Sequence, residues 1–404
     1  MPSTEPRQQL LQIFLDAVAA VNGRHCVAEA LKAAPPAGPL ALVALGKAAV
    51  AMAQGACDQL GGQISRALIV TKHGHQGPLP WPIMTASHPL PDESSLAAGA
   101  ALMEFIDALP ETEQLLVLLS GGASSLVEVL PAGVSLDSLQ RLNHWFLASG
   151  VDIVTGNEIR KRLSLIKGGR LAQRLWPRRV KCLTISDVPG DDPASIASGP
   201  LSGPRPFDLP AATPGWINDL IASTAQVDEP MRFDHVDIEM VASVSRAMHA
   251  AADSARRLGY DVVLHRELLQ GDVIEAGPLL AQALEQSAAR TVHIWGGETT
   301  VRLPDSPGRG GRNQSLALAT AIALAGHSNE YFLAAGTDGT DGPGEDAGAV
   351  VDGDTVTRGL ASGINVADAL RQADAGTFLE AAGDLIATGA TGTNVMDLAI
   401  GMKQ

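Results

Sequence analysis

Residues 115–126 read LLVLLSGGASSL, and this stretch decides which folds the chain can adopt. The five aliphatic residues 115–119 are too few to span a membrane, but they suit a strand buried on both faces of a parallel sheet. The strand ends at a turn rich in glycine and hydroxyl residues, namely Ser120, Gly121, Gly122, Ser124 and Ser125. Such a turn lets N–H groups and hydroxyls approach a phosphate or carboxylate, although a strand-to-helix turn without a ligand has the same composition. It has neither the lysine of a Walker A loop nor the full dinucleotide fingerprint.

Length and composition favour two α/β domains. The chain has 404 residues, more than one hydrophobic core usually serves. Only 3% of residues are aromatic and 42 are glycine, which suits close packing of helices on sheets and argues against a β-sandwich. The formal net charge of −15 argues against nucleic acid or an anionic membrane as a partner. An anionic substrate therefore needs a locally basic pocket.

The cysteines and the first residues indicate a cytoplasmic protein. Cys26, Cys57 and Cys182 are widely spaced and match no zinc pattern, which predicts structural thiols in a reducing cytosol. Residues 1–22 are interrupted by charged side chains, so they predict an amphipathic helix rather than an apolar export segment.

Strand and helix patterns alternate along the chain. The predicted strands cover 40–45, 67–71, 83–86, 115–119, 180–185, 237–243, 261–265, 291–295 and 331–335, and the main predicted helices cover 48–59, 136–149, 245–258, 272–286 and 314–325. Proline and glycine crowd 199–215, which we interpret as a connection leading out of the first domain. We therefore expect domains at 1–235 and 236–404, and a hairpin near 385–400 that returns to a polar site.

Several predicted strands end in clusters of glycine, hydroxyl and carboxylate residues, at 46–47, 120–125, 186–192, 296–300 and 336–342. Open α/β sheets bind ligands at the carboxyl ends of their strands, so these clusters predict one cleft for a small polar ligand such as a phosphate ester. Lys47 precedes a helix, where the helix dipole favours anions, although a solvated lysine is the alternative.

Two basic segments are the predicted anion ligands of this acidic chain. The first is 157–174, in which Arg160 and Lys167 are the residues that we expect to face an anion, while others are solvated. The second is GRGGRNQ at 308–314, where two arginines and three glycines precede a helix. A flexible linker is the alternative for the second segment.

Carboxylates and histidines give weaker signals. Asp187 and Asp192 follow a strand in a Pro/Gly turn and suit Mg²⁺, which takes one or two carboxylates plus phosphates and water, but turn capping is the alternative. His73, His75 and His88 have loop-like flanks, and we interpret them as solvated.

Nine motifs occur in order between about Arg7 and Met402: ALGKAA at 44–49, SHPLPDE at 87–93, LSGGASSL at 119–126, NEIRKRLSLIKGGRLA at 157–172, TISDVPGDDPASIASGP at 184–200, GGETTV at 296–301, GRGGRNQSLALA at 308–319, GTDGTDG at 336–342 and TGTNVMD at 391–397. Together they resemble the class II glycerate 2-kinases, often labelled hydroxypyruvate reductases, whose C-terminal half is called the MOFRL domain.

The resemblance implies two dissimilar three-layer α/β/α domains, the first Rossmann-like with a parallel sheet and the second with a mixed sheet, and an active site in the cleft between them. It also implies ATP- and Mg²⁺-dependent phosphorylation of D-glycerate to 2-phosphoglycerate. The partners would be D-glycerate and ATP, with no nucleic acid or membrane, and the protein would be a monomer or a homodimer.

Carried over motif by motif, the essential lysine of the family falls on Lys47 and its essential arginine on Arg312. Asp187 is a third catalytic candidate and, with Asp192, a candidate metal ligand. The implied substrate- or phosphate-binding residues are Ser120, Gly121, Gly122, Ser124, Ser125, Asn157, Arg160, Lys167, Glu298, Asn313, Asp338 and Asn394. Three departures from the family pattern, Ala123, Ser245 and Ala390, concern loop geometry and nucleotide affinity rather than the reaction.

Two other functions fit the same fold. An NAD(P)H-dependent hydroxypyruvate reductase needs a GxGxxG-type turn with an acidic residue about twenty positions later, and the sequence has no such unit. A non-catalytic sensor of sugar acids or nucleotides is the second alternative, because a fold alone does not fix function.

Overall fold

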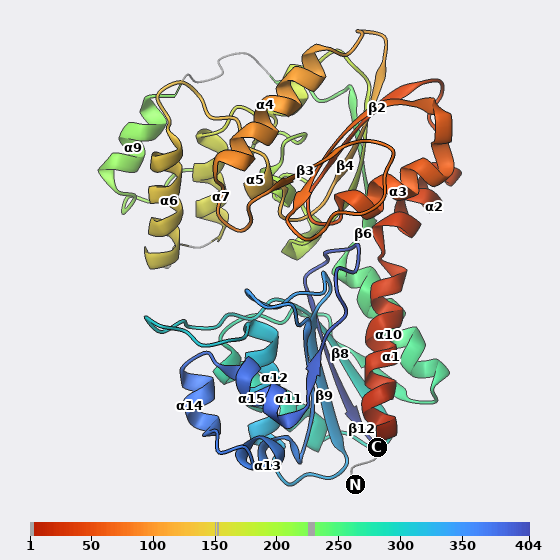
Figure 1. The fold of residues 1–404 in the computed structure, drawn as a ribbon, viewed down its shortest axis with the longest axis vertical. Coiled ribbons are helices and arrows are strands. Elements are labelled where there is room, and N and C mark those ends of the chain that lie inside the picture. The colour runs from red at the N-terminus through yellow and green to blue at the C-terminus, as the bar shows by residue number, and fades with distance from the viewer. Residues whose placement is uncertain (1–3, 150, 152, 225–230) are drawn as a thin grey trace. The chain divides into compact units, whose positions relative to one another are not determined.

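The computed structural model describes residues 4–149, 151, 153–224 and 231–404. The chain forms two compact units, which we call the N-terminal unit, Gly23–Val241, and the C-terminal unit, Met1–Asn22 with Ala242–Gln404 (Figure 1). The expected domain division at 235/236 differs from these units in two ways. The first helix belongs with the C-terminal unit, and the strand at Val236–Ala242 adds to the sheet of the N-terminal unit.

A six-stranded sheet forms the centre of the N-terminal unit. Its strands are β1 (Leu40–Leu45), β2 (Ile64–Lys72), β3 (Ile83–Ala86), β4 (Gln114–Leu119), β5 (Val180–Ile185) and β6 (Val236–Ala242). They lie in the order β3-β2-β1-β4-β5-β6, and the pairs from β3 to β5 are parallel. This order confirms the predicted Rossmann-like sheet, because the chain reverses direction across the sheet between β1 and β4.

Helices cover both faces of this sheet (Figure 1). The α-helices are α2 (Gly23–Ala33), α3 (Ala49–Leu60), α4 (Glu93–Asp107), α5 (Ala123–Leu126), α6 (Leu136–Ser149), α7 (Ile153–Arg162), α8 (Arg170–Leu175) and α9 (Gly215–Ala222), with short 3₁₀ turns at Gly61–Gln63, Pro189–Asp191 and Ile196–Ser198. All six residues of β1 are buried, as expected for a strand covered on both faces.

The C-terminal unit contains a mixed sheet, as predicted. Its strands are β7 (Asp261–Leu264), β8 (Thr291–Gly297), β9 (Glu330–Gly336), β10 (Gly348–Asp352), β11 (Leu385–Ile386) and β12 (Asp397–Lys403), in the order β11-β10-β9-β12-β8-β7. Strands β7 and β8 pair in parallel, whereas β10 pairs antiparallel with β9 and β11, and β12 pairs antiparallel with β8 and β9. The predicted hairpin at 385–400 is wrong, because β10 and β9 lie between β11 and β12.

Helices also cover both faces of the second sheet. They are α1 (Thr4–Ala20), α10 (Val244–Arg257), α11 (Val273–Glu285), α12 (Arg312–Ala323), α13 (Thr355–Leu360), α14 (Val366–Arg371) and α15 (Ala375–Ala382). Helices α1 and α10 pack together on one face, and α11 and α12 pack together on the other (Figure 1). The predicted three-layer arrangement is therefore confirmed for both units.

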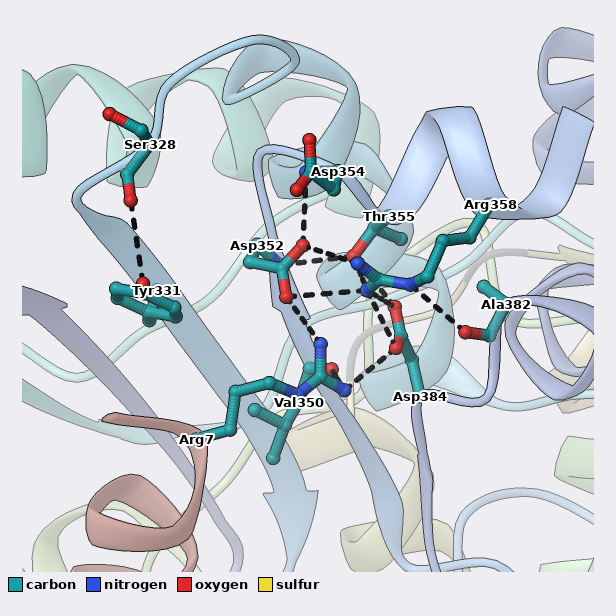
Figure 2. Close-up of polar contacts among 10 residues, drawn as sticks. All are labelled: Arg7, Ser328, Tyr331, Val350, Asp352, Asp354, Thr355, Arg358, Ala382 and Asp384. Carbon is teal, nitrogen blue, oxygen red and sulfur yellow. Dashed lines mark hydrogen bonds and ion pairs between the residues drawn. The ribbon is translucent and has the colours of Figure 1, made fainter. Parts of the chain in front are cut away.

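A buried ion network explains why α1 belongs to the C-terminal unit. The Arg7 guanidinium lies 2.6 Å from the Asp352 carboxylate and 2.7 Å from that of Asp384, and Arg358 contacts the same two carboxylates (Figure 2). Further along α1, the apolar side chains of Leu10, Ile13, Phe14 and Ala17 are fully buried. Both the charged and the apolar faces of the helix thus find their partners in residues that come more than 200 positions later.

The cysteines and hydropathy agree with the sequence patterns. All three cysteines carry free thiols, with Cys26 and Cys182 buried and Cys57 half-buried. Among the described residues, no helix combines the length and apolar character that crossing a membrane would require.

Candidate functional site

The turns that follow β1 and β4 are hydrogen-bonded to each other at the point where the strand order reverses. The backbone N–H of Lys47 donates to the carbonyl of Gly121 at 2.9 Å, and the N–H of Ala48 donates to the Ser120 hydroxyl at 3.1 Å. Ser120 is fully buried, so its hydroxyl holds the two turns together instead of facing a ligand. Lys47 lies in this turn, two residues before α3 begins.

Gly122 allows two side chains, those of His88 and Lys47, to approach the SGG turn closely. Its φ of +85° lies in the left-handed region, which residues other than glycine rarely adopt. A Cβ at this position would lie 3.1 Å from Cδ2 of His88 and 3.2 Å from Cγ of Lys47. The absent side chain therefore makes room for the imidazole and for the lysine stem.

A cavity of about 180 Å³ opens beside this turn. Its lining comes from α5, α6, α7 and the loops beside them, and consists of His88, Pro89, Pro91, Gly122, Ser124, Ser125, Glu128, Leu139, Asn143, Arg160 and Lys167. Five predicted site residues are in this lining: Gly122, Ser124, Ser125, Arg160 and Lys167. Ser124 hydrogen-bonds Ser198 through their hydroxyls at 2.6 Å, and the Ser125 hydroxyl donates to the Gly122 carbonyl at 3.1 Å.

The two predicted cations of the cavity have different partners. Lys167 is 3% exposed, and its ammonium forms an ion pair with the carboxylate of Glu128, which is 2% exposed. Arg160 donates to the side-chain oxygens of Asn157 and Asn143, both at 3.2 Å, and stacks over the ring of Phe146. Burial lowers the pKa of Arg160, and the nearby Glu128 opposes that effect. Asn157 therefore supports Arg160 rather than lining the cavity itself.

Asp187 and Asp192 follow β5, as predicted. The Asp192 carboxylate accepts from the Ala194 N–H at 3.1 Å and from the Ser195 hydroxyl at 3.0 Å, and it pairs with Arg205 at 2.9 Å. These contacts are those of a turn-capping aspartate. Asp187 is half-buried immediately beyond the strand end. In the described parts of the chain, no three His, Cys, Asp or Glu side chains gather as a preformed metal site.

In the C-terminal unit, a protein carboxylate already occupies the start of α12. Asp341 accepts hydrogen bonds from the backbone N–H groups of Asn313 at 3.0 Å and Gln314 at 2.8 Å. Burial raises the pKa of Asp341 to about 6, although these two N–H donors oppose the shift. The predicted anion site at 308–314 is thus filled by the chain's own anion at the helix N-terminus.

Arg312 is the first residue of α12, and it lies among carboxylates. Its guanidinium forms two hydrogen bonds with Asp397, at 2.5 and 3.1 Å, and one with Glu298 at 2.7 Å. Burial opposes its charge, but these carboxylates outweigh burial and raise the pKa of Arg312. Burial also raises the pKa of Asp397, while Arg312 acts in the opposite direction. The other arginine of the segment, Arg309, pairs with Asp346 and Glu380.

The remaining predicted residues of this unit lie near the same strand ends. Asp397 is the first residue of β12, opposite the last residues of β8 and β9. Asp338 follows β9 and accepts from the N–H and hydroxyl of Thr340, and its charge acts on Asp397. Asn394 is buried three residues before β12. The structure therefore places Glu298, Arg312, Asn313 and Asp338 near the end of the sheet where β8 and β9 terminate.

Two protein-family models match the chain. Residues 9–207 match the "Domain of unknown function (DUF4147)", and residues 291–397 match the "MOFRL family". A D-glycerate 2-kinase of Thermotoga maritima is 38% identical to this chain over 89% of the chain and 90% of the relative. The chain belongs to the glycerate 2-kinase family. Human glycerate kinase is 33% identical over 89% of the chain and 83% of the relative.

Other relatives carry a different name or provide a structure. A protein of Agrobacterium vitis named putative hydroxypyruvate reductase is 38% identical over 97% of the chain and 93% of the relative. The crystal structure of a Thermotoga maritima glycerate kinase matches with a TM-score of 0.85 at 35% identity, covering 99% of this chain and all of that one. A Pyrococcus horikoshii protein matches with a TM-score of 0.75 at 30% identity, covering 98% of both chains.

Sequence patterns assigned no individual role to four charged or titratable residues at these sites, His88, Glu128, Asp341 and Asp397, although Asp341 lies in the predicted cluster at 336–342 and Asp397 in the motif at 391–397. Glu128 is a single carboxylate four positions beyond Ser124, and nothing in its local spacing indicates a partner at Lys167, 39 positions later. His88 was interpreted as solvated, but it lines the cavity. Its place directly after a strand, as at the other clusters, is the signal that could have indicated it.

Proposed function

We propose that this protein is a glycerate 2-kinase, which transfers the γ-phosphoryl group of ATP to the C2 hydroxyl of D-glycerate. The observation that carries the proposal is the cavity at the β1/β4 reversal, which combines Arg160 and Lys167 with hydroxyl side chains in a protein whose net charge is −15. Membership of the glycerate 2-kinase family supports the same reaction. A cavity of about 180 Å³ suits a three-carbon acid rather than a whole nucleotide.

Within this proposal, the cations of the cavity bind the glycerate carboxylate. Arg160 hydrogen-bonds two amide oxygens and stacks over the Phe146 ring, so a substrate carboxylate can approach its charge without displacing a described carboxylate partner. Ser124, Ser125 and His88 lie in the same lining, where hydroxyl and imidazole groups can orient the substrate hydroxyls.

We assign catalytic roles to Lys47 and Arg312. Phosphoryl transfer requires mainly positioning and the stabilisation of charge on the transferring group. Lys47 is held in the turn between β1 and α3, and Arg312 is held at the start of α12. The backbone from which each charged side chain extends is therefore in a defined position. Glu298 and Asp397 orient the Arg312 guanidinium with three hydrogen bonds.

The contacts of one of the two predicted magnesium ligands, Asp192, argue against a metal there. Asp187 stands just beyond β5, where one carboxylate together with nucleotide phosphates and water meets the usual requirement of this ion. Asp192 fits poorly, because Arg205 and two turn donors already hold its carboxylate. When bound, Mg²⁺ would neutralise charge on the nucleotide phosphates.

The names of some relatives keep hydroxypyruvate reduction as a second candidate. One assay separates the two: purified protein is mixed with D-glycerate, ATP and MgCl₂, and the product is identified by phosphorus NMR. We expect 2-phosphoglycerate, and we expect no oxidation of NADH or NADPH with hydroxypyruvate. A 3-phospho product would overturn the proposed regiochemistry, and nucleotide oxidation without ADP release would overturn the kinase itself.

Location and assembly are also proposals. The free thiols support a cytoplasmic enzyme, and we propose that it acts as a monomer or a homodimer. Light scattering coupled to gel filtration measures the assembly directly.

A further inference from the structure

Glu128 is a buried carboxylate in the wall of the cavity, and its position is fixed by several contacts. Its backbone N–H donates to the Ser95 carbonyl at 3.1 Å. Its Oε1 accepts from the Ser164 hydroxyl at 2.6 Å and from the Val129 N–H at 3.0 Å, and its Oε2 contacts the Lys167 ammonium. Both carboxylate oxygens are therefore held in place.

The charged side chains of the cavity lining do not cancel one another completely. Arg160 and Lys167 each contribute one positive charge and Glu128 one negative charge, so these three side chains of the lining sum to a charge of +1. The buried pair of Glu158 and Lys161 lies outside the lining and is neutral as a pair. In a water-poor site, each uncompensated charge on a ligand costs more than it does in bulk solvent.

We propose that Glu128 determines substrate specificity by cancelling one of the two cationic charges, so that the cavity accepts hydroxy acids with one carboxylate and rejects those with two. This inference rests on the proposed function and names the substrate class of the same cavity. D-Glycerate and tartronate make a matched pair for it. Both carry a C2 hydroxyl and a C1 carboxylate, but tartronate has a second carboxylate in place of the hydroxymethyl group.

The variant Glu128→Gln tests the inference, because it keeps the shape of the side chain and removes its charge. We expect the ratio of kcat/KM for tartronate to kcat/KM for glycerate to rise about tenfold or more, as for one charge added at close range in a partly desolvated site. Glu158→Gln is the matched control. It removes a carboxylate from another buried lysine pair in the same unit, and it should leave the ratio unchanged.

The double variant Glu128→Gln/Lys167→Met restores the wild-type net charge without the ion pair. We expect its ratio to return to within about threefold of the wild-type value, because the single charge of Arg160 remains. If Glu128→Gln melts too early to be assayed, the double variant can still overturn the inference, since a ratio shifted by tenfold or more would show that Glu128 acts through a specific contact and not through charge.

Calorimetric titration of each acid without ATP separates this inference from the proposed function. If the wild type binds glycerate but does not phosphorylate it, the kinase proposal fails, and the binding ratio of Glu128→Gln still tests the charge argument. If the wild type phosphorylates glycerate and the ratio in Glu128→Gln stays unchanged, only the inference fails. Binding of neither acid would also overturn the inference.

Discussion

Two glycine-rich turns of this molecule look alike in sequence and differ in what fills them. The SGG turn after β4 borders a cavity, and the side chains of Ser124 and Ser125 line it. The GRGGRNQ segment before α12 leads instead to a helix start where the Asp341 carboxylate accepts from two backbone N–H groups. The pattern of glycine before a helix thus predicts that an anion is favoured there, but not whether the anion comes from a ligand or from the protein.

The same difference extends to the cations of the two turns. Among the described contacts, Arg160 has amide partners, whereas Arg312 has two carboxylate partners. A ligand anion approaching Arg312 must therefore compete with Glu298 and Asp397. We infer that Arg160 binds substrate charge directly, and that Arg312, like Lys47, acts mainly on the charge that develops in the transition state.

The largest effect is expected at Lys47. Replacing Lys47 by Ala should lower kcat by roughly two to four orders of magnitude, as for groups that stabilise developing charge, while KM for glycerate changes far less. Steady-state kinetics measure both constants. Lys32→Ala, at an exposed lysine of α2, is the control and should leave both unchanged. A large rise in KM with near-normal kcat would contradict the role assigned to Lys47.

Arg312 should differ from Lys47 in its effect on stability. Arg312→Ala leaves the buried Asp397 carboxylate without its main counterion, and we expect a loss of roughly 3 kcal/mol in unfolding free energy, reduced from the cost in a fully buried pair because the Arg312 side chain is 35% exposed. Urea unfolding measures it. Arg309→Ala in the same segment, whose partners are more exposed, should cost well under 1 kcal/mol. Equal losses in both variants would remove the distinction between the two arginines.

The carboxylate at the start of α12 predicts a pH dependence with a definite sign. The pKa of Asp341 is raised from its usual value of 3.8 to about 6, so the folded protein binds a proton more readily than the unfolded chain. The contribution of protonated Asp341 to the free energy of unfolding is complete below pH 4 and is lost as the pH rises through 6.

Relative to Asp341→Asn, the wild type should therefore lose about 2 kcal/mol between pH 4 and pH 7. Calorimetric melts of both proteins across that range measure the difference, with Asp346→Asn as the control at a more exposed carboxylate. If the wild type instead gained stability relative to Asp341→Asn as the pH rises, the folded protein would favour the ionised form of Asp341, and the raised pKa would be contradicted.

The smallest effect on stability is expected at Gly122. Gly122→Ala places a Cβ in the left-handed region and against His88 and Lys47, so it should cost about 1–2 kcal/mol and also lower activity by displacing both side chains. Gly38→Ala is the matched control. Gly38 has a φ of +80° with nothing within 4 Å, so it carries the same backbone strain without the neighbours. Equal activity in the two variants would show that the contacts at Gly122 are unimportant.

Local sequence patterns predicted the parts of this molecule that depend on local order. The strands at Leu40–Leu45, Ile83–Ala86 and Val180–Ile185 were predicted to the residue, because each is a short, mainly apolar run with a clear break at its end. Strand β10 was missed, since its GAVVD sequence is short and follows a long glycine-rich loop.

The candidate site was predicted less completely, because partners far apart in sequence decide its charges. Arg160 and Lys167 were identified from a basic segment, and both line the cavity. Their counterpart Glu128 carries no local signal, and neither does Asp397, which reaches Arg312 from 85 positions later. Ser120 was predicted to bind a ligand, but its hydroxyl is used between two turns.

The placement of α1 has a consequence for how the polypeptide is made. A ribosome releases residues 4–20 long before Asp352 and Asp384, which hold Arg7 and lie 345 and 377 positions after it in the chain. The apolar face of α1 must therefore wait, exposed or held by a chaperone, while the whole N-terminal unit is synthesised and folds. A gene fragment that begins at codon 242 would lack this helix altogether, and would leave Arg358 alone to compensate two buried carboxylates.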